Sequence, residues 1–179
     1  MSGLRARLDA LDTLSVMRLG LLGLAVGAVL VTAAELTFLA HWDGTLQLLP
    51  WMALVSVALA IVLVAVRPGR GTIRIARALA GVSFLLGAVG VLVHVISNRD
   101  AGVLDYRYTA TWPTMSELQR WWLAATGGVG PTPSLAPMSL AFSAVLVLLA
   151  SIRVPVRATS PVPVAVQPAR IGYDDPSPP

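Results

Sequence analysis

The sequence contains no cysteine and no lysine, and few of its side chains are charged. Without cysteine, disulfides, thiol nucleophiles and cysteine-ligated metals are excluded. Charged residues make up 12% of the 179 residues, about half the usual share in a soluble domain, whereas 56% are hydrophobic. A soluble fold of this length could not remove so much apolar surface from water. The composition therefore predicts an integral membrane protein.

Four apolar stretches interrupt the polar sequence, at 19–40, 46–66, 78–97 and 135–152. About 20 apolar residues cross a hydrocarbon core roughly 30 Å thick, and only a helix satisfies its own backbone over that length. We expect an all-α bundle of four transmembrane helices over 19–152, flanked by 1–18 and 153–179. In the alternative, a signal peptide is cleaved near Ala33 and Ala34, which leaves three spans in the same orientation.

All 13 cationic residues are arginine, and most fall on one side of this pattern. They occur in 1–18, in the loop 67–77 and directly after the fourth stretch, so both termini are expected in the cytoplasm and the protein in the plasma (inner) membrane of a bacterium. Because they lie at helix ends rather than on one basic face, a nucleic-acid partner is not expected. Four are predicted to contact anionic lipid headgroups: Arg67, Arg70, Arg74 and Arg77.

The two ends of the chain differ in character. Leucines at helical spacing in 4–14 predict a short amphipathic helix on the inner leaflet, or an extension of the first span. Proline is dense after residue 160, which predicts a disordered cytoplasmic tail or a peptide ligand for a protein partner.

The long connection 98–133, here called the cap, is predicted to be ordered and to lie outside the cell. Aromatic residues alternate with polar ones in 106–112, which predicts an extended strand. Thr114 and Glu117 match a capping box, so a helix is expected from there to about Thr126, ended by Gly127 and Gly128. An ordered cap is a candidate surface for a protein partner.

All five tryptophans lie on the outer side of this arrangement. We interpret them as an aromatic belt at the membrane interface, where one edge of the indole is wet and the other apolar. The alternative is an aromatic-lined pocket under the cap. The residues concerned are Trp42, Trp51, Trp112, Trp121 and Trp122.

Glu35 lies roughly 7 Å inside the outer end of the first span, where a charge is costly. His94 has a similar depth in the third span. Small residues line one face of each of these helices, which predicts that the two helices meet. One hypothesis is a site for a proton, cation or polar ligand, with candidates Glu35, His41, His94, Asn98 and Arg99. The other is a structural Glu–His or Glu–Arg hydrogen bond that fixes helix packing.

No catalytic constellation and no metal-binding motif accompany these residues. No cofactor is therefore expected, although a haem or metal at His41 and His94 stays open as an alternative. An enzyme acting on lipid ranks below the other function classes.

The sequence resembles small, uncharacterised four-span bacterial integral membrane proteins. The resemblance covers 20–152 and rests on Glu35, His41 and the run Gln47-Leu48-Leu49-Pro50, on His94 with Asn98, and on Leu135-Ala136-Pro137. It implies a four-helix architecture and draws attention to Glu35, His41, His94 and Asn98, but implies no activity.

From the sequence, the leading function is a non-enzymatic small membrane subunit or scaffold whose cap meets a partner. The alternative is a membrane protein that binds an ion, proton or small ligand, or a transporter component, and that uses Glu35 and His94.

Overall fold

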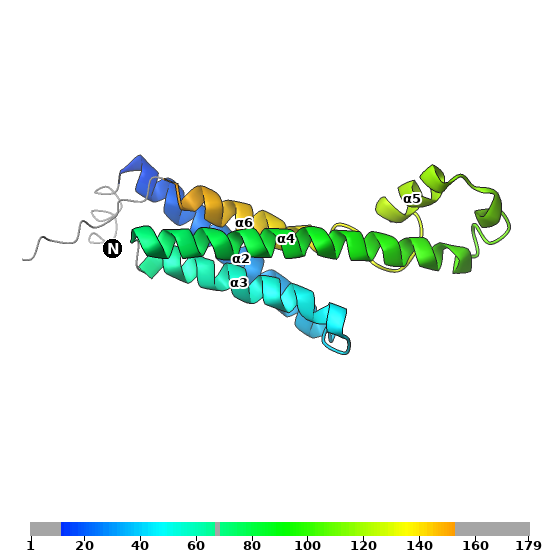
Figure 1. Cartoon of the computed structure of the whole chain (residues 1–179), viewed down its shortest axis with the longest axis horizontal. Coiled ribbons are helices and arrows are strands. Elements are labelled where there is room, and N and C mark those ends of the chain that lie inside the picture. The colour runs from blue at the N-terminus through cyan, green and yellow to red at the C-terminus, as the bar shows by residue number, and fades with distance from the viewer. Residues whose placement is uncertain (1–11, 67–68, 153–179) are drawn as a thin grey trace, which may run out of the picture.

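The structure, a computed structural model, describes residues 12–66 and 69–152, and these residues form helices and turns without any strand. Four apolar helices form the bundle: α2 (Thr13–Phe38), α3 (Leu48–Val66), α4 (Arg70–Ala101) and α6 (Met138–Ala150). Figure 1 shows α4 running far beyond the other three and carrying the short helix α5 (Glu117–Ala125) at its far end. The predicted amphipathic segment 4–14 and the tail 153–179 lie mostly or wholly outside the described residues.

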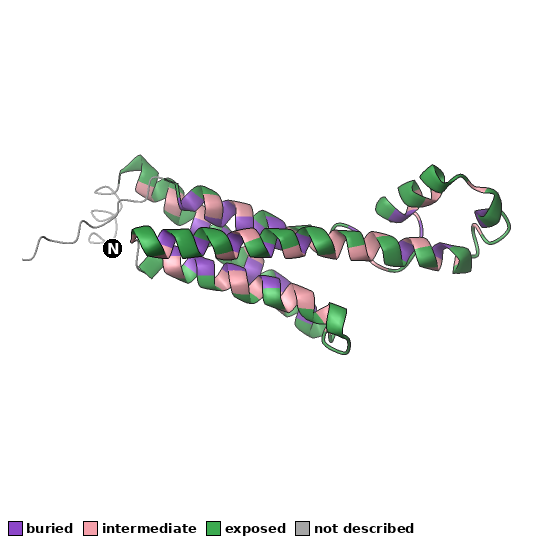
Figure 2. Cartoon of the chain, viewed as in Figure 1, coloured by how far each residue is buried: buried purple, intermediate pink, exposed green. Residues whose placement is uncertain are grey.

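Three of these helices are long and apolar enough to cross a membrane: α2, α3 with the 3-10 turn before it, and α4. Only a minority of their residues are buried, and exposed residues are spread along all three helices, as Figure 2 shows. Outward-facing leucines and valines on every helix would be untenable in water and need an apolar solvent. The chain is therefore a helical membrane protein.

α2 begins before its predicted limit, and α4 extends beyond both of its predicted limits, because polar residues extend these helices. Asp12 caps α2, accepting a hydrogen bond from the backbone of Ser15 at 2.9 Å, so the helix begins at Thr13. α4 begins at Arg70, and most of the predicted loop 67–77 is therefore helical. At 1.5 Å per residue its 32 residues extend about 48 Å, well beyond the hydrocarbon thickness of about 30 Å.

α6 has only 13 residues, fewer than predicted, because the preceding segment with Pro133 and Pro137 returns without helical structure. Arginines from two neighbouring helices hold its C-terminal end. Arg18 donates to the carbonyl of Ala150 at 3.2 Å, and Arg77 donates to the hydroxyl and the carbonyl of Ser151, each at 2.9 Å.

The prediction that the first and third spans meet is wrong. α6 packs against both α2 and α4, which make few contacts with each other. A Cβ added at any of Gly20, Gly23 and Gly27 of α2 would meet nothing within 4 Å. Two glycines of α4 do allow a close approach, but to α6 and the residue before it. A Cβ on Gly87 would lie 3.0 Å from the backbone nitrogen of Ala141, and one on Gly90 would lie 2.8 Å from Pro137 Cβ.

The cap also differs from its prediction. Residues 106–111 form turns rather than a strand, because the backbone N–H groups of Tyr108, Thr111 and Trp112 are all bonded to nearby carbonyls. The capping box lies two residues later than predicted, on Ser116 and Gln119. Thr114 cannot serve, because its hydroxyl donates to the carbonyl of Thr111 at 2.8 Å.

The end of α5 agrees with the prediction. The helix ends at Ala125, and Gly127 follows with a φ of 72°, a conformation that favours glycine. Behind α5, Trp112 packs in a small core with Ala124 and Val129.

Candidate ligand-binding groove

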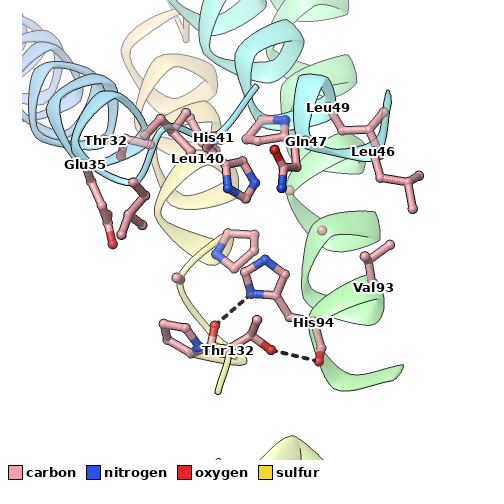
Figure 3. A pocket seen from close by; sticks show the side chains of 18 of the residues that line it. Thr32, Glu35, His41, Leu46, Gln47, Leu49, Val93, His94, Thr132 and Leu140 are labelled. Atoms are coloured by element: carbon pink, nitrogen blue, oxygen red, sulfur yellow. Dashed lines mark hydrogen bonds between the residues drawn. The ribbon is translucent and has the colours of Figure 1, made fainter. Parts of the chain in front are cut away.

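A cavity of about 280 Å³ lies at the cap end of the bundle, between the α2–α3 hairpin on one side and α4 with the return segment 132–137 on the other. Figure 1 shows the hairpin diverging from α4 toward this end, and Figure 3 shows the residues around the opening. We call this cavity the groove. Its walls are mainly apolar: Leu36, Leu39, Leu46, Leu49, Pro50, Leu86, Val93, Ala136, Pro137 and Leu140.

Four larger polar side chains reach the same groove. Glu35 comes from α2, His41 and Gln47 from the turn between α2 and α3, and His94 from α4. The sequence singled out three of the four. An apolar cavity with a few convergent polar groups is the usual form of a small-molecule site.

His94 is held by the return segment. Its Nδ1 lies 2.9 Å from the carbonyl oxygen of Pro133, and its own carbonyl accepts from the hydroxyl of Thr132 at 3.3 Å. A carbonyl can only accept, so Nδ1 must carry the proton and Nε2 is left as an acceptor when the ring is neutral. Figure 3 shows this second nitrogen turned away from Pro133, toward the side of the groove on which His41 lies.

His41 is positioned by the end of α2. Its N–H donates to the carbonyl of Leu36 at 2.9 Å, and the N–H of Ala40 donates to Thr37 at 3.1 Å, which together form a Schellman turn. Ala40 occupies the left-handed position of that turn with a φ of 46°. The carbonyl of His41 accepts from Trp51 Nε1 at 2.7 Å, which ties the hairpin turn to α3.

Gln47 was not among the residues predicted for the site. The backbone N–H of Asp43 donates to its Oε1 at 2.8 Å, and this bond sets the orientation of the side-chain amide. The amide nitrogen then points into the groove, as Figure 3 shows. Its signals in the sequence were its position at the start of an apolar run and its place in the run Gln47-Leu48-Leu49-Pro50.

Glu35 lies on the α2 side of the groove, across from His94 (Figure 3). Within the described residues, no hydrogen bond or ion pair joins its carboxylate to His94, His41 or an arginine. The side chain is exposed at this end of α2. The described contacts thus give no support to the predicted structural Glu–His or Glu–Arg bond.

Asn98 and Arg99, also predicted for the site, lie beyond the groove and hold the cap. Asn98 is fully buried and donates to the carbonyl of Thr132 at 2.7 Å and to the hydroxyl of Ser134 at 3.0 Å. Arg99 donates to Glu117 Oε2 at 2.6 Å and stacks 4.9 Å above the ring of Trp121. That arginine lowers the pKa of the Glu117 carboxyl.

The tryptophans do not form one group. Trp42 and Trp51 are paired at the hairpin turn, with ring centroids 6.4 Å apart, and Trp121 and Trp122 lie exposed on α5. Trp112 is buried in the core of the cap, so it cannot belong to an interface belt. None of the five lines the groove.

The described residues contain no group of three or more His, Cys, Asp or Glu side chains placed to hold a metal ion. Of the arginines predicted at lipid headgroups, Arg70 and Arg74 are exposed, Arg77 is bonded to Ser151, and Arg67 lies outside the described residues.

The fold and the groove together define a helical membrane protein with an apolar cavity at the cap end of its bundle. No protein-family model, no curated protein and no solved structure matches this chain.

Proposed function

We propose that this chain is a four-span protein of the plasma membrane, with both termini in the cytoplasm, that binds a small, largely apolar ligand in the groove at the outer end of its bundle. The observation that carries this proposal is the convergence of Glu35, His41, Gln47 and His94 on one apolar cavity. Intramembrane polar residues are costly to insert and are usually retained for a function.

The return segment supports a fourth span even though α6 alone would extend only about 20 Å. Non-helical backbone at membrane depth needs its polar groups satisfied by the protein. Here Pro131, Pro133 and Pro137 have no N–H, and the N–H of Thr132 donates to Asn98 at 3.0 Å. The carbonyls of Thr132 and Pro133 are bonded to Asn98 and His94. From Asn98 down to Arg77, opposite Ser151, α4 rises about 31 Å.

The groove is within reach of lipid. Leu39 and Leu46 line it and are 64% and 63% exposed, so its rim is apolar and open. A ligand that already resides in the membrane could enter sideways between the hairpin and α4 without first crossing water.

The proposal is tested by filling the groove. Val93 lines it, whereas Leu92, the preceding residue, is 56% exposed and lies outside it. We expect Val93→Trp to remove small-molecule adducts that native mass spectrometry detects on protein extracted in its own lipids. Leu92→Trp should keep them. Adducts that persist in Val93→Trp, or are missing from the unmodified protein, would contradict the proposal.

A membrane subunit or scaffold is the second candidate, and the cap surface favours it. Leu104, Tyr106, Leu118 and Trp122 are 83%, 90%, 79% and 67% exposed. Such a surface is typical of contact with a protein partner or the membrane interface. Purification in mild detergent should then co-isolate a partner at fixed stoichiometry, and Leu118→Glu should lose it. Recovery of the unmodified chain alone would count against this candidate.

A further inference from the structure

The groove carries two hydrogen-bonding side chains whose donor and acceptor roles are fixed by bonds to backbone groups. The side-chain amide of Gln47 is oriented by the N–H of Asp43, which donates to Oε1 at 2.8 Å. The amide NH₂ group is then the part presented to the cavity, and an NH₂ group can only donate.

His94 supplies the complementary group. Because Nδ1 donates to the Pro133 carbonyl at 2.9 Å, Nε2 of the neutral ring can only accept. In metal sites the same arrangement, in which one ring N–H donates to a backbone carbonyl, fixes the orientation of the other ring nitrogen. Beside the imidazole of His41, the groove therefore presents one oriented donor and one oriented acceptor, from opposite walls.

The charged residues around the groove further limit which ligand head groups can bind there. Neither an arginine nor a lysine lines it, and the one charged side chain that does is acidic, Glu35. A phosphate or carboxylate head would find no permanently charged cation there and would lie near the acidic Glu35, so such a head is disfavoured. An ammonium head could approach Glu35 and donate to His94, but it offers no acceptor to the amide of Gln47.

We infer that the groove binds an uncharged amphiphile whose head carries a hydroxyl group, on an apolar chain. A hydroxyl both donates and accepts, so it can donate to His94 Nε2 while it or a neighbouring oxygen accepts from Gln47. The apolar lining residues, among them Leu36 and Leu140, contact the apolar chain of the ligand. This inference rests on the proposed function, since it names the class of ligand for the same groove.

The test uses four probes that share one oleoyl or oleyl chain. Monooleoylglycerol donates and accepts, its dimethyl ether only accepts, oleylamine is a cation, and oleoyl-lysophosphatidylglycerol is an anion. Binding of each to the full chain in nanodiscs of a saturated phospholipid is measured by native mass spectrometry. We expect monooleoylglycerol to bind about tenfold more tightly than the ether, as one buried hydrogen bond provides, and more tightly than either charged probe.

Two variants test whether His94 Nε2 and the amide of Gln47 are the groups that distinguish the probes. In His94→Asn the shorter amide can keep the bond to the Pro133 carbonyl and has no group at the position of Nε2. This variant should bind monooleoylglycerol and the ether equally. Gln47→Met removes the donor at similar side-chain length, so it should weaken both probes while the preference for monooleoylglycerol remains.

The outcomes separate this inference from the proposed function. If the ether or a charged probe binds the unmodified protein as well as monooleoylglycerol, and Val93→Trp abolishes that binding, the groove binds ligands but the inferred head is wrong. If His94→Asn keeps the preference for the hydroxyl, the assignment to Nε2 is wrong. If no probe binds, or if Val93→Trp binds all of them unchanged, the proposed function itself fails.

Discussion

Asn98 and Thr132 form a reciprocal pair: Asn98 Nδ2 donates to the Thr132 carbonyl at 2.7 Å, and the Thr132 N–H donates to Asn98 Oδ1 at 3.0 Å. The pair joins the end of α4 to the return segment. Pro133, the next residue, carries the carbonyl that fixes His94. The side chain that holds the cap therefore also sets the position of one wall of the groove.

Replacing Asn98 should destabilise both the cap and the wall of the groove formed by the return segment. Asn98→Leu keeps the branched shape of the side chain but leaves buried backbone groups of Thr132 without partners, and we expect a loss of about 3 kcal/mol in the free energy of unfolding. Near-ultraviolet circular dichroism during thermal unfolding would report it through the buried Trp112. Asp100→Asn, an exposed change two residues along the same helix end, should have little effect. Equal stability of the two variants would contradict this role for Asn98.

Two cap glycines with positive φ provide a matched pair. Gly127 has a φ of 72° and open space around the position of a Cβ. Gly127→Ala should therefore lower the free energy of unfolding only by the cost of placing alanine in the left-handed conformation, about 1 kcal/mol. Gly130 has a φ of 79°, and a Cβ there would overlap Asn98 Oδ1 and lie 2.6 Å from Asn98 Cα.

Gly130→Ala should therefore be clearly more destabilising than Gly127→Ala, by at least another 1–2 kcal/mol. The comparison needs only the midpoints of thermal unfolding in the same detergent. If both variants lost the same stability, the close approach of Gly130 to Asn98 would be refuted.

Hydropathy was sufficient to predict a helical membrane protein, because each long apolar run can hide its backbone in only one way. The helix ends were less predictable, because local hydrogen bonds decide where a helix begins. The side chains of Asp12 and Ser116 make these bonds at the starts of α2 and α5. Alternation in 106–112 predicted a strand, but no partner strand exists among the described residues, and turns satisfy the backbone instead.

The residues of the site, too, were only partly predictable from the sequence. Glu35 and His94 were identified because each is a titratable side chain inside an apolar run, and both line the groove. Asn98 and Arg99 were close to His94 in sequence, yet α4 continues past the groove and carries them into the cap. Gln47 could not be identified in advance, because its role depends on the turn that brings it next to Asp43.

The glycines of α2 and α4 should respond in opposite directions to the same substitution. Gly23→Ala meets open space and replaces a weak helix former with a strong one, so stability should rise or stay unchanged. Gly90→Ala would place a Cβ 2.8 Å from Pro137 Cβ and push α6 away from α4. Its expected loss is about 1–3 kcal/mol in the free energy of unfolding. A loss of equal size in both variants would contradict the observed packing of α6 against α4.

Acid should weaken the contact between α4 and α5. The Arg99 guanidinium holds the pKa of the Glu117 carboxyl below its ordinary value of 4.5, and Arg120 acts in the same direction. A lowered folded pKa means that the stabilisation is present above the ordinary pKa and is lost as the pH falls through the lowered one. Below about pH 4.5 the ring of Trp121, which lies under Arg99, should change its fluorescence.

Glu117→Gln isolates this effect from other carboxyls, such as Asp105, whose pKa Arg107 lowers. The difference in unfolding midpoint between the unmodified protein and Glu117→Gln should shrink as the pH drops, because protonated Glu117 and glutamine are both neutral. A difference that stays constant from pH 7 to pH 3 would show that the Arg99–Glu117 ion pair does not stabilise the cap.

The turn that positions His41 carries a residue that the backbone conformation disfavours. Ala40 has a φ of 46° at the left-handed position of the Schellman turn, where glycine is the usual residue. Ala40→Gly should therefore raise the free energy of unfolding by about 0.5–1 kcal/mol. Ala34→Gly, an exposed site inside α2, should lower it by about 1 kcal/mol, because there glycine only adds freedom to the unfolded chain. Thermal unfolding of the two variants side by side gives the sign of each change, and a loss of stability in both would mean that Ala40 does not adopt the left-handed conformation in the membrane.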